Sequence, residues 1–301
     1  MDYEKISFGS GNGVPFAVIE GVRHFDADRI FDCGQCFRFS SFVTSDGHRE
    51  WCGAAGGKYI AVRQEDRKVT VFGTDEQDFY GFYHAFLGLG DDYGAINRDI
   101  LSRSDNPRLL EALTAEDGIR ILKQERWEAL CSFIISQNNN IPRIKSLVSA
   151  LCERCGIPAE CAGMEAHGAK EKEYAFPSPG AVAELGVEEL SALKTGFRAE
   201  YIHGAAVALA EGRTDFESVA SAGSYAEAAA ELMALRGVGP KVAACALLFG
   251  FGRLDAFPVD VWVKRIIARY FGENFDPCGL GPYAGVAQQY LFRYERGFDG
   301  N

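Results

Sequence analysis

The sequence predicts an α+β protein in which a small antiparallel β-sheet precedes an all-helical domain. Two observations lead to this fold class. Apolar and polar residues alternate with a strand-like period between residues 14 and about 74, and the period becomes helical from Asp75 onward. The chain has 301 residues, of which 47% are hydrophobic, and this is enough for two cores. We therefore expect a β-rich domain at residues 1–115 and a helical domain at residues 116–301.

Two turns predict the hairpins of the sheet. Residues 58–63 and 68–72 alternate on either side of a polar turn at residues 64–67. Asp46 and Gly47 form the dipeptide that is typical of a second tight hairpin. Both turns join strands that are neighbours along the chain, so the sheet is expected to be antiparallel.

Helical periodicity covers most of the remaining chain. The predicted helices span residues 76–88, 106–114, 126–136, 141–154, 187–193, 198–211, 224–235, 240–250, 260–271 and 281–295. Residues 156–179 contain several glycines and prolines and are expected to form a loop.

Composition narrows the class of protein. No run of 18 apolar residues predicts a membrane span, and the polar first ten residues do not resemble a signal peptide. The net charge of −11 is unusual for a DNA-binding protein, but residues 236–269 carry a local charge of +4. Nine cysteines without regular spacing suit a reducing compartment. We expect a bacterial-type cytoplasmic, nucleoid-associated protein.

The cysteine spacings do not favour a metal site. Cys33 and Cys36, and also Cys152 and Cys155, are separated by two residues, as in zinc knuckles. The next cysteine, Cys161, is wrongly spaced for a common four-ligand knuckle. We therefore expect no structural metal and no cofactor.

The segment from Leu235 to Cys245 predicts a helix–hairpin–helix. Gly237 and Gly239 permit a tight turn with positive φ between two helices, and Pro240 suits the first position of the second helix. The free N–H groups at that helix start can bind a phosphate. The glycines alone would equally suit a plain helical hairpin.

Lys241 lies in the first turn of the second helix, four residues before Cys245 and on the same face. The position alone is compatible with a phosphate contact. Positive surroundings disfavour the charged form of an amine, however, and this is one way to prepare a nucleophile.

Asp260 ends the segment Phe-Pro-Val-Asp and precedes a helix, which predicts an N-cap. Most aspartates at such positions only cap. Here a carboxylate follows a hairpin lysine by about twenty residues, so it could also stabilise positive charge on a sugar whose glycosidic bond is breaking.

The two motifs together, Gly-Val-Gly-Pro-Lys-Val-Ala at 237–243 and Pro-Val-Asp at 258–260, resemble the helix–hairpin–helix DNA glycosylase superfamily. Further segments resemble its 8-oxoguanine DNA glycosylase branch, and the similarity runs from about residue 12 to 295. These segments are Gly-Gln-Cys-Phe-Arg-Phe at 34–39, Phe-Ile-Ile-Ser-Gln-Asn-Asn-Asn-Ile-Pro-Arg at 133–143, Gly-Phe-Arg-Ala-Glu-Tyr at 196–201, and Gly281 to Phe292.

The resemblance implies a TBP-like N-terminal sheet and a bifunctional DNA N-glycosylase with AP lyase activity. Lys241 would attack the anomeric carbon and form a Schiff base, and Asp260 would assist. The base pocket would use the Gly34 carbonyl for the N7–H of 8-oxoguanine, Gln288 for the Watson–Crick edge, and Cys245 and Phe292 as the two faces of a sandwich.

The resemblance also implies how duplex DNA containing 8-oxoguanine opposite cytosine is held. Asn138 would fill the gap left by the flipped base, Phe197 would wedge the opposite strand, and Arg143 and Arg198 would hold the orphaned cytosine. Phe197 replaces the usual tyrosine, and Trp262 replaces a histidine that contacts phosphate. We expect a monomer without membrane contact. The alternatives are a monofunctional alkylbase glycosylase, which lacks the hairpin lysine, and a non-catalytic DNA-binding module.

Overall fold

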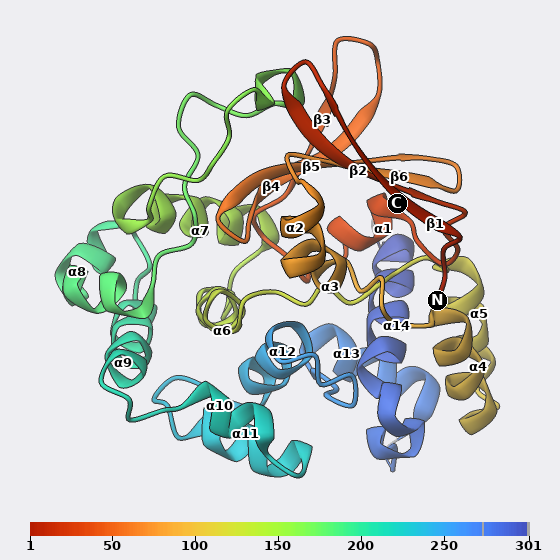
Figure 1. Ribbon diagram of the computed structural model, residues 1–301. Helices are drawn as coiled ribbons and strands as arrows, with labels where there is room; N and C mark the ends of the chain where they lie inside the picture. Colours follow the sequence, from red (N-terminus) through yellow and green to blue (C-terminus); the bar gives the residue numbers. More distant parts are fainter. Residues whose placement is uncertain (273, 300–301) are drawn as a thin grey trace.

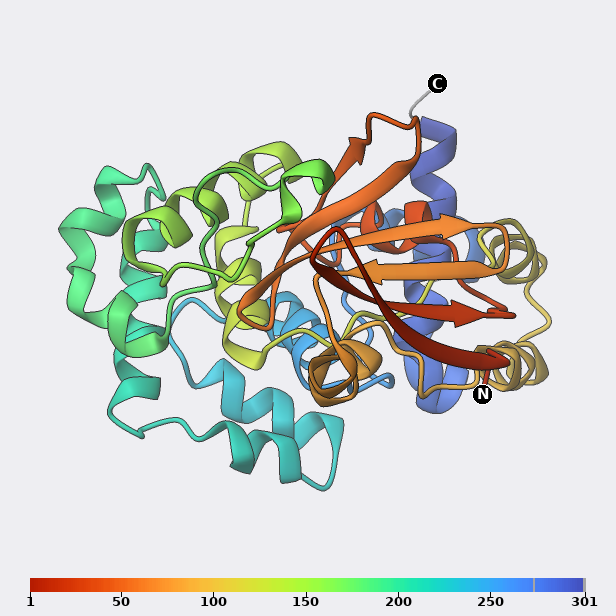
Figure 2. The ribbon, with the colours of Figure 1, turned by 45° about the horizontal axis from the view of Figure 1, so that its top comes forward.

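The computed structural model describes residues 1–272 and 274–299 and confirms the α+β class. Six antiparallel strands form one sheet in the order β1-β2-β6-β5-β4-β3. Figure 2 shows the sheet in front of α14. The strands are β1 (Lys5–Gly11), β2 (Val14–Glu20), β3 (Ser40–Val43), β4 (Arg49–Ala55), β5 (Lys58–Glu65) and β6 (Lys68–Phe72).

Both predicted hairpins are present. Gly47 has a φ of +86° in the turn between β3 and β4. At the end of the β5–β6 hairpin, Glu65 pairs with Lys68. Strand β1 was not predicted, because its sequence is rich in glycine and serine and buries little surface. It pairs along its full length with β2 and extends the sheet by one strand.

The sheet buries one face against its own short helices. Ile19, Ile60 and Val71 are fully buried there with aromatic residues of the following segments. The rings of Phe31 and Phe39 stack at 4.6 Å, which fixes the ends of the segment that contains Gly34. The core of the sheet therefore anchors both ends of the loop that contains Gly34.

The helical part surrounds α6, which Figure 1 places near the centre, with α7–α9 on one side and α12 on the other. The helices are α1 (Ala27–Phe31), α2 (Glu76–Asp78), α3 (His84–Phe86), α4 (Tyr93–Arg103), α5 (Pro107–Ala115), α6 (Arg126–Ile135), α7 (Ile141–Cys155), α8 (Pro179–Ala192), α9 (Arg198–Ala210), α10 (Phe216–Ser221), α11 (Tyr225–Met233), α12 (Pro240–Gly250), α13 (Val261–Ile266) and α14 (Ala284–Asp299).

Several helices differ from the prediction. The prediction missed α4 and α10. Helix α8 begins eight residues before the predicted start of 187, and Gly186 bends it with a φ of +77°. Helix α13 is shorter than predicted because its last turns become a π-helix at Ile267–Phe271. Helices α4 and α5 contribute to the helical core rather than to the sheet core. The division at residue 115 stays a prediction.

Helix α12, which carries the predicted nucleophile, is almost completely buried. Residues 242–249 are all buried, so the helix cannot shift without disturbing the core. Lys241 lies on the first turn of this helix, so its backbone is held in a fixed position. Burial of α12 therefore preorganises the amine.

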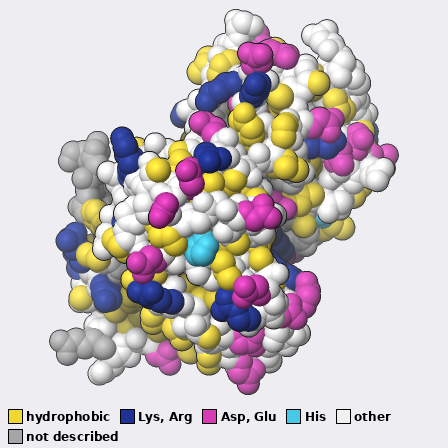
Figure 3. All heavy atoms as spheres, turned by 90° about the vertical axis from the view of Figure 1, so that its left-hand side faces the viewer, with side chains coloured by type: hydrophobic (Ala, Val, Ile, Leu, Met, Phe, Trp, Pro, Cys, Tyr) yellow, Lys and Arg dark blue, Asp and Glu magenta, His cyan; other side chains and the backbone are white. Residues whose placement is uncertain are grey.

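The surface carries mixed charge. Acidic and basic side chains are interspersed over the face seen in Figure 3. Among the described residues, no helix is both long enough and apolar enough to cross a membrane. All nine cysteines are free, and no three potential ligands among His, Cys, Asp and Glu of the described part gather into a metal-binding group.

Candidate active site

The predicted hairpin joins α11 to α12. Gly237 has a φ of +86°, and a Cβ there would lie 2.1 Å from Cγ of Tyr201, so only glycine fits. Gly239 differs from the prediction. Its φ is −92° and its ψ 179°, so it is an extended N-cap rather than a positive-φ residue. Pro240 then begins α12 as expected.

Lys241 is held from the side of α6. Its Nζ donates a hydrogen bond to Ser136 Oγ at 3.1 Å and lies 5.1 Å from the centre of the Phe133 ring. The hydroxyl of Ser136 donates in turn to the Phe133 carbonyl at 2.8 Å. Because that bond uses the only hydroxyl proton, Oγ is left to accept from the amine. Ser136 therefore orients Lys241, a role that the sequence did not indicate.

Asp260 is the N-cap of α13, as predicted. Its Oδ1 accepts from the Val263 N–H at 2.8 Å. Asp260 and Lys241 line the same cavity, which also contains Cys245. Burial raises the pKa of the Cys245 thiol, the Lys241 charge lowers it, and the Asp260 charge raises it. The Cys245 thiol therefore lies close enough to both predicted catalytic groups for their charges to affect its pKa.

The cavity, called here the base cavity, is lined by Gly34, Cys245, Gln288, Phe292, Lys241 and Asp260, among others. All six predicted pocket and catalytic residues thus meet in one place. The cavity measures about 50 Å³, room for a water molecule or two. A purine would therefore have to move the lining side chains apart.

Helix α14 supplies a polar wall to the base cavity. Gln288 is 3% exposed, and its Oε1 accepts from Nε2 of the neighbouring Gln289 at 2.7 Å. The Oε1 of Gln289 is buried without a partner. Buried unpaired amide oxygens cost free energy, so a ligand that donates a hydrogen bond would be favoured here. Gln289 was not among the predicted site residues, although it directly follows Gln288 in the sequence.

Gly34 needs its glycine for backbone reasons. Its φ is +78°, which disfavours any side chain. A Cβ would lie 3.5 Å from Ile141 and 3.8 Å from Phe292, which is ordinary contact. The left-handed turn, rather than lack of space, therefore decides the residue.

A groove of about 850 Å³ adjoins the base cavity and shares Lys241 and Asp260 with it. Asn138 lines this groove in the left-handed conformation, with a φ of +51°. Phe197 also lines it and is 53% exposed, which is unusual for a phenylalanine. Trp262 lies on the same groove, beside the guanidinium of Arg265. An exposed ring and a strained asparagine are features of a contact surface.

The two predicted arginines do not line this groove. Arg198 is 7% exposed and donates to the Gln137 carbonyl at 2.7 Å and to the Thr195 carbonyl at 3.1 Å. It braces the loop that carries Asn138. Arg143 donates to the Lys194 carbonyl at 3.1 Å.

Comparison with known proteins agrees with the geometry. Residues 17–130 match the family described as "8-oxoguanine DNA glycosylase, N-terminal domain", and residues 131–277 match the "HhH-GPD superfamily base excision DNA repair protein" family. A crystal structure of the Clostridium acetobutylicum 8-oxoguanine glycosylase/lyase with double-stranded DNA is 32% identical, with a TM-score of 0.87 over 99% of this chain and 100% of that one. The chain belongs to the 8-oxoguanine DNA glycosylase family.

Curated members of this glycosylase family support the assignment. The N-glycosylase/DNA lyase OGG1 of Arabidopsis thaliana is 28% identical, covering 88% of this chain and 72% of its own length. The probable N-glycosylase/DNA lyase of Methanothermobacter thermautotrophicus is 30% identical, covering 66% of this chain and 70% of its own length. The chain is therefore an N-glycosylase with lyase activity.

Substitution of Ser136 tests how the glycosylase orients its lysine. Ser136→Ala should lower the single-turnover excision rate roughly tenfold, the value of one oriented hydrogen bond. DNA affinity should stay nearly unchanged, because the hydroxyl of this groove-lining residue is already bonded to the Lys241 amine and the Phe133 carbonyl. Ser136→Thr keeps the hydroxyl and should restore most of the rate. An alanine variant that is as fast as the wild type would show that Ser136 has no positioning role.

Proposed function

We propose that this enzyme excises 8-oxoguanine opposite cytosine from duplex DNA by base flipping, with Lys241 as nucleophile and Asp260 as electrostatic partner. The observation that carries the proposal is the meeting of Lys241, Asp260 and four pocket residues in the base cavity. These residues come from four separate segments, and chance would not gather them.

The chemistry follows from the groups present. A base inside the stack hides its sugar bond, so the nucleotide must first rotate out at a cost of a few kcal/mol. The lone pair of the neutral Lys241 amine then forms a bond to the anomeric carbon, and the electrons of the glycosidic bond leave with the base. The Asp260 carboxylate stabilises the positive sugar during this step. The departing base and the ring oxygen O4′ take up the protons that the attacking nitrogen loses, and the C1′–O4′ bond opens to leave a Schiff base between Lys241 and C1′. The Schiff base acidifies the neighbouring C2′, and loss of a C2′ proton drives β-elimination of the 3′ phosphate.

Discrimination against guanine rests on Gly34. The lesion carries an N7–H that guanine lacks, and the Gly34 carbonyl would accept it. With guanine, the acceptor and N7 would face each other unpaired in a desolvated pocket. A base in the cavity would also bring a hydrogen-bond donor to the buried Oε1 of Gln289, which otherwise has no partner.

The decisive experiment incubates the enzyme with an 8-oxoguanine:cytosine duplex and borohydride. The proposal expects a trapped covalent adduct together with a nicked strand. Base release without an adduct would support a monofunctional alkylbase-type mechanism. DNA binding without base release would support a non-catalytic module. We also propose that the enzyme acts as a monomer, which gel filtration would test.

A second prediction concerns the opposite base. A bidentate arginine contact discriminates bases by about 1–3 kcal/mol, so 8-oxoguanine opposite adenine should be processed about ten to a hundred times more slowly than opposite cytosine. Arg143→Ala should bring the excision rates opposite adenine and opposite cytosine closer together. Arg154→Ala is the matched control, because it lies on the same helix α7 but pairs with Glu189 at 2.9 Å. Equal rates for both duplexes in the wild type would refute the assignment of Arg143.

A further inference from the structure

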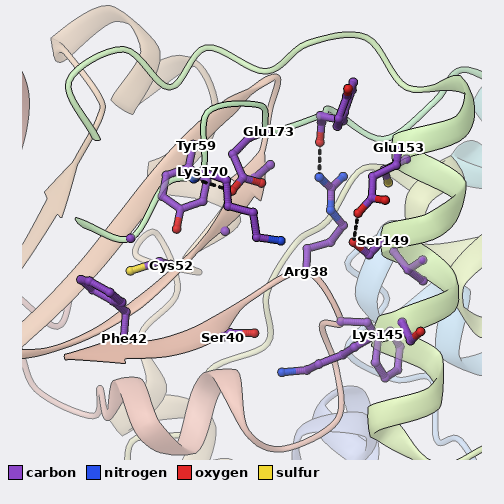
Figure 4. Close-up of a pocket in the computed structure, with 18 of the residues that line it drawn as sticks. Arg38, Ser40, Phe42, Cys52, Tyr59, Lys145, Ser149, Glu153, Lys170 and Glu173 are labelled. Carbon is purple, nitrogen blue, oxygen red and sulfur yellow. Dashed lines mark hydrogen bonds between the residues drawn. The ribbon is translucent and has the colours of Figure 1, made fainter. Parts of the chain in front are cut away.

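A second cavity lies away from the active site, between the sheet and α7, and is called here the interdomain cavity. Its volume is about 600 Å³, within the range of small-molecule sites. Strands β3 and β4 form one wall, α7 forms another, and residues 168–174 close over it (Figure 4). It shares no lining residue with the base cavity, and only Phe37 with the adjoining groove.

The interdomain cavity is positively charged on an acidic protein. Four cationic and two anionic side chains line it, an excess of two positive charges, although the whole chain carries −11. The lining charges are Arg38, Lys145, Lys170, Lys172, Glu153 and Glu173. Charge that runs against the composition of the chain indicates an anionic ligand.

The two lining carboxylates make no ion pair with the lining cations among the described residues, although Arg38 pairs with the buried Glu128 next to the cavity. Glu153 accepts from the Ser149 hydroxyl at 2.9 Å. Glu173 accepts from the backbone N–H of Lys170 at 3.1 Å. No ion pair involves the ammonium of Lys170 or of Lys172 among the described residues. These donors are therefore available to a ligand.

Two further cations keep unused donors. Lys145 donates once, to the Phe39 carbonyl at 2.6 Å, and an ammonium has three donors. The Arg38 side chain is 9% exposed, donates to the Tyr174 carbonyl, and lies 3.9 Å from buried Glu128. That separation is too long for a hydrogen bond. Figure 4 shows Lys145 and Lys170 extending toward the open centre from opposite walls.

The rest of the lining combines apolar and aromatic residues with the serines Ser40, Ser41, Ser146 and Ser149. Phe42 and Cys52 come from neighbouring strands, and Tyr59 and Tyr174 lie near them. A ligand that suits both halves has a phosphate for the cations and a planar ring for the aromatic wall. We propose that the interdomain cavity binds a free nucleoside monophosphate, with its phosphate on Arg38, Lys145 and Lys170 and its base toward Phe42.

Such a ligand would brace the active site from behind. Arg38 follows Gly34 by four residues in one segment, and Lys145 follows Arg143 on α7. The ligand would thus connect the segment of Gly34, which is proposed to recognise the flipped base, to helix α7, which carries the arginine proposed to contact the opposite DNA strand. Binding itself does not depend on the proposed excision reaction, so the two can fail separately.

The experiment is isothermal titration calorimetry, which measures the affinity of the full chain for AMP, GMP and adenosine. Both nucleotides should bind, and adenosine should bind at least about tenfold more weakly, because it lacks the charged partner. The double variant Lys145→Ala, Lys170→Ala should weaken nucleotide binding roughly a hundredfold, about tenfold for each ammonium. Lys68→Ala is the control, since Lys68 sits in the β5–β6 hairpin and pairs with Glu65. It should bind like the wild type.

Four outcomes would overturn the proposal. They are that neither nucleotide binds, that adenosine binds equally well, that the double variant binds unchanged, or that the double variant loses duplex affinity with a shallower salt dependence. The last result would make these lysines contacts to DNA phosphates. Excision of 8-oxoguanine by the double variant without nucleotide should match the wild type, which separates this test from that of the proposed function.

Discussion

Lys241→Gln should give no borohydride-trapped adduct with an 8-oxoguanine:cytosine duplex, and base excision should slow by at least about a thousandfold. The amide has no basic lone pair to attack the anomeric carbon, so the covalent route is lost. The fold should survive, because the side chain is only half-buried and contacts the edge of the core through Ser136 and Cys245 rather than filling it. Single-turnover excision and a denaturing gel of trapped species measure both effects.

The matched control is Lys264→Gln. Lys264 lines the same groove as Lys241 but is exposed on α13. It should lose a phosphate contact, so DNA affinity should fall and the salt dependence should become shallower by about one ion. The adduct should still form at saturating DNA. An adduct that persists in Lys241→Gln would exclude Lys241 as the nucleophile.

The sequence predicted the fold class, the hairpin turn and the helix cap, but not the exact bounds of several helices. Gly237, Pro240 and Asp260 could be recognised because turns and caps require particular residues at particular places. Gly34 was found only through the family resemblance, since one glycine in a loop has many explanations. Its φ of +78° supplies the physical reason afterwards.

Other features were out of reach because they depend on tertiary contacts. The orienting role of Ser136 requires α6 and α12 to lie side by side, and no local pattern encodes that. Arg198 looked like a DNA contact, yet in this structure its donors serve the loop carbonyls of Gln137 and Thr195. Helix α4 was missed although Tyr93, Ile96 and Ile100 are buried at helical spacing, because the rest of the helix is polar and Gly94 lowers its local propensity.

Asp260 joins structure and chemistry in one side chain. One carboxylate oxygen caps α13 and so fixes the orientation of the group. The helix dipole stabilises the charged carboxylate at the same time. An anion that is already oriented needs no reorganisation when the sugar becomes positive. Capping and the proposed electrostatic assistance are therefore compatible roles of one side chain, and the sequence suggested both.

The largest effect on stability is expected at Arg120, which is fully buried. Its guanidinium donates to Asp2 Oδ2 at 2.7 Å and to backbone carbonyls of His24 and Gly88, each at 2.7 Å. It thereby joins the N-terminus to two loops of the sheet domain. Arg120→Met would leave the Asp2 carboxylate buried without its cation, with only the Tyr93 N–H still donating to it, and would remove the donor to these carbonyls. Removing one partner of a buried pair costs about 3–5 kcal/mol.

For a chain of this size, that loss should lower the melting temperature by about 10 °C. Arg213→Met removes an exposed arginine paired with Glu211, so it should cost less than about 1 kcal/mol. Adding Asp2→Asn to Arg120→Met removes the stranded charge and should recover part of the loss. Urea unfolding of the three variants measures these differences. If Arg120→Met unfolds at the wild-type urea concentration, the buried pair does not hold the sheet domain together, and the N-terminus must be fixed by the pairing of β1 with β2.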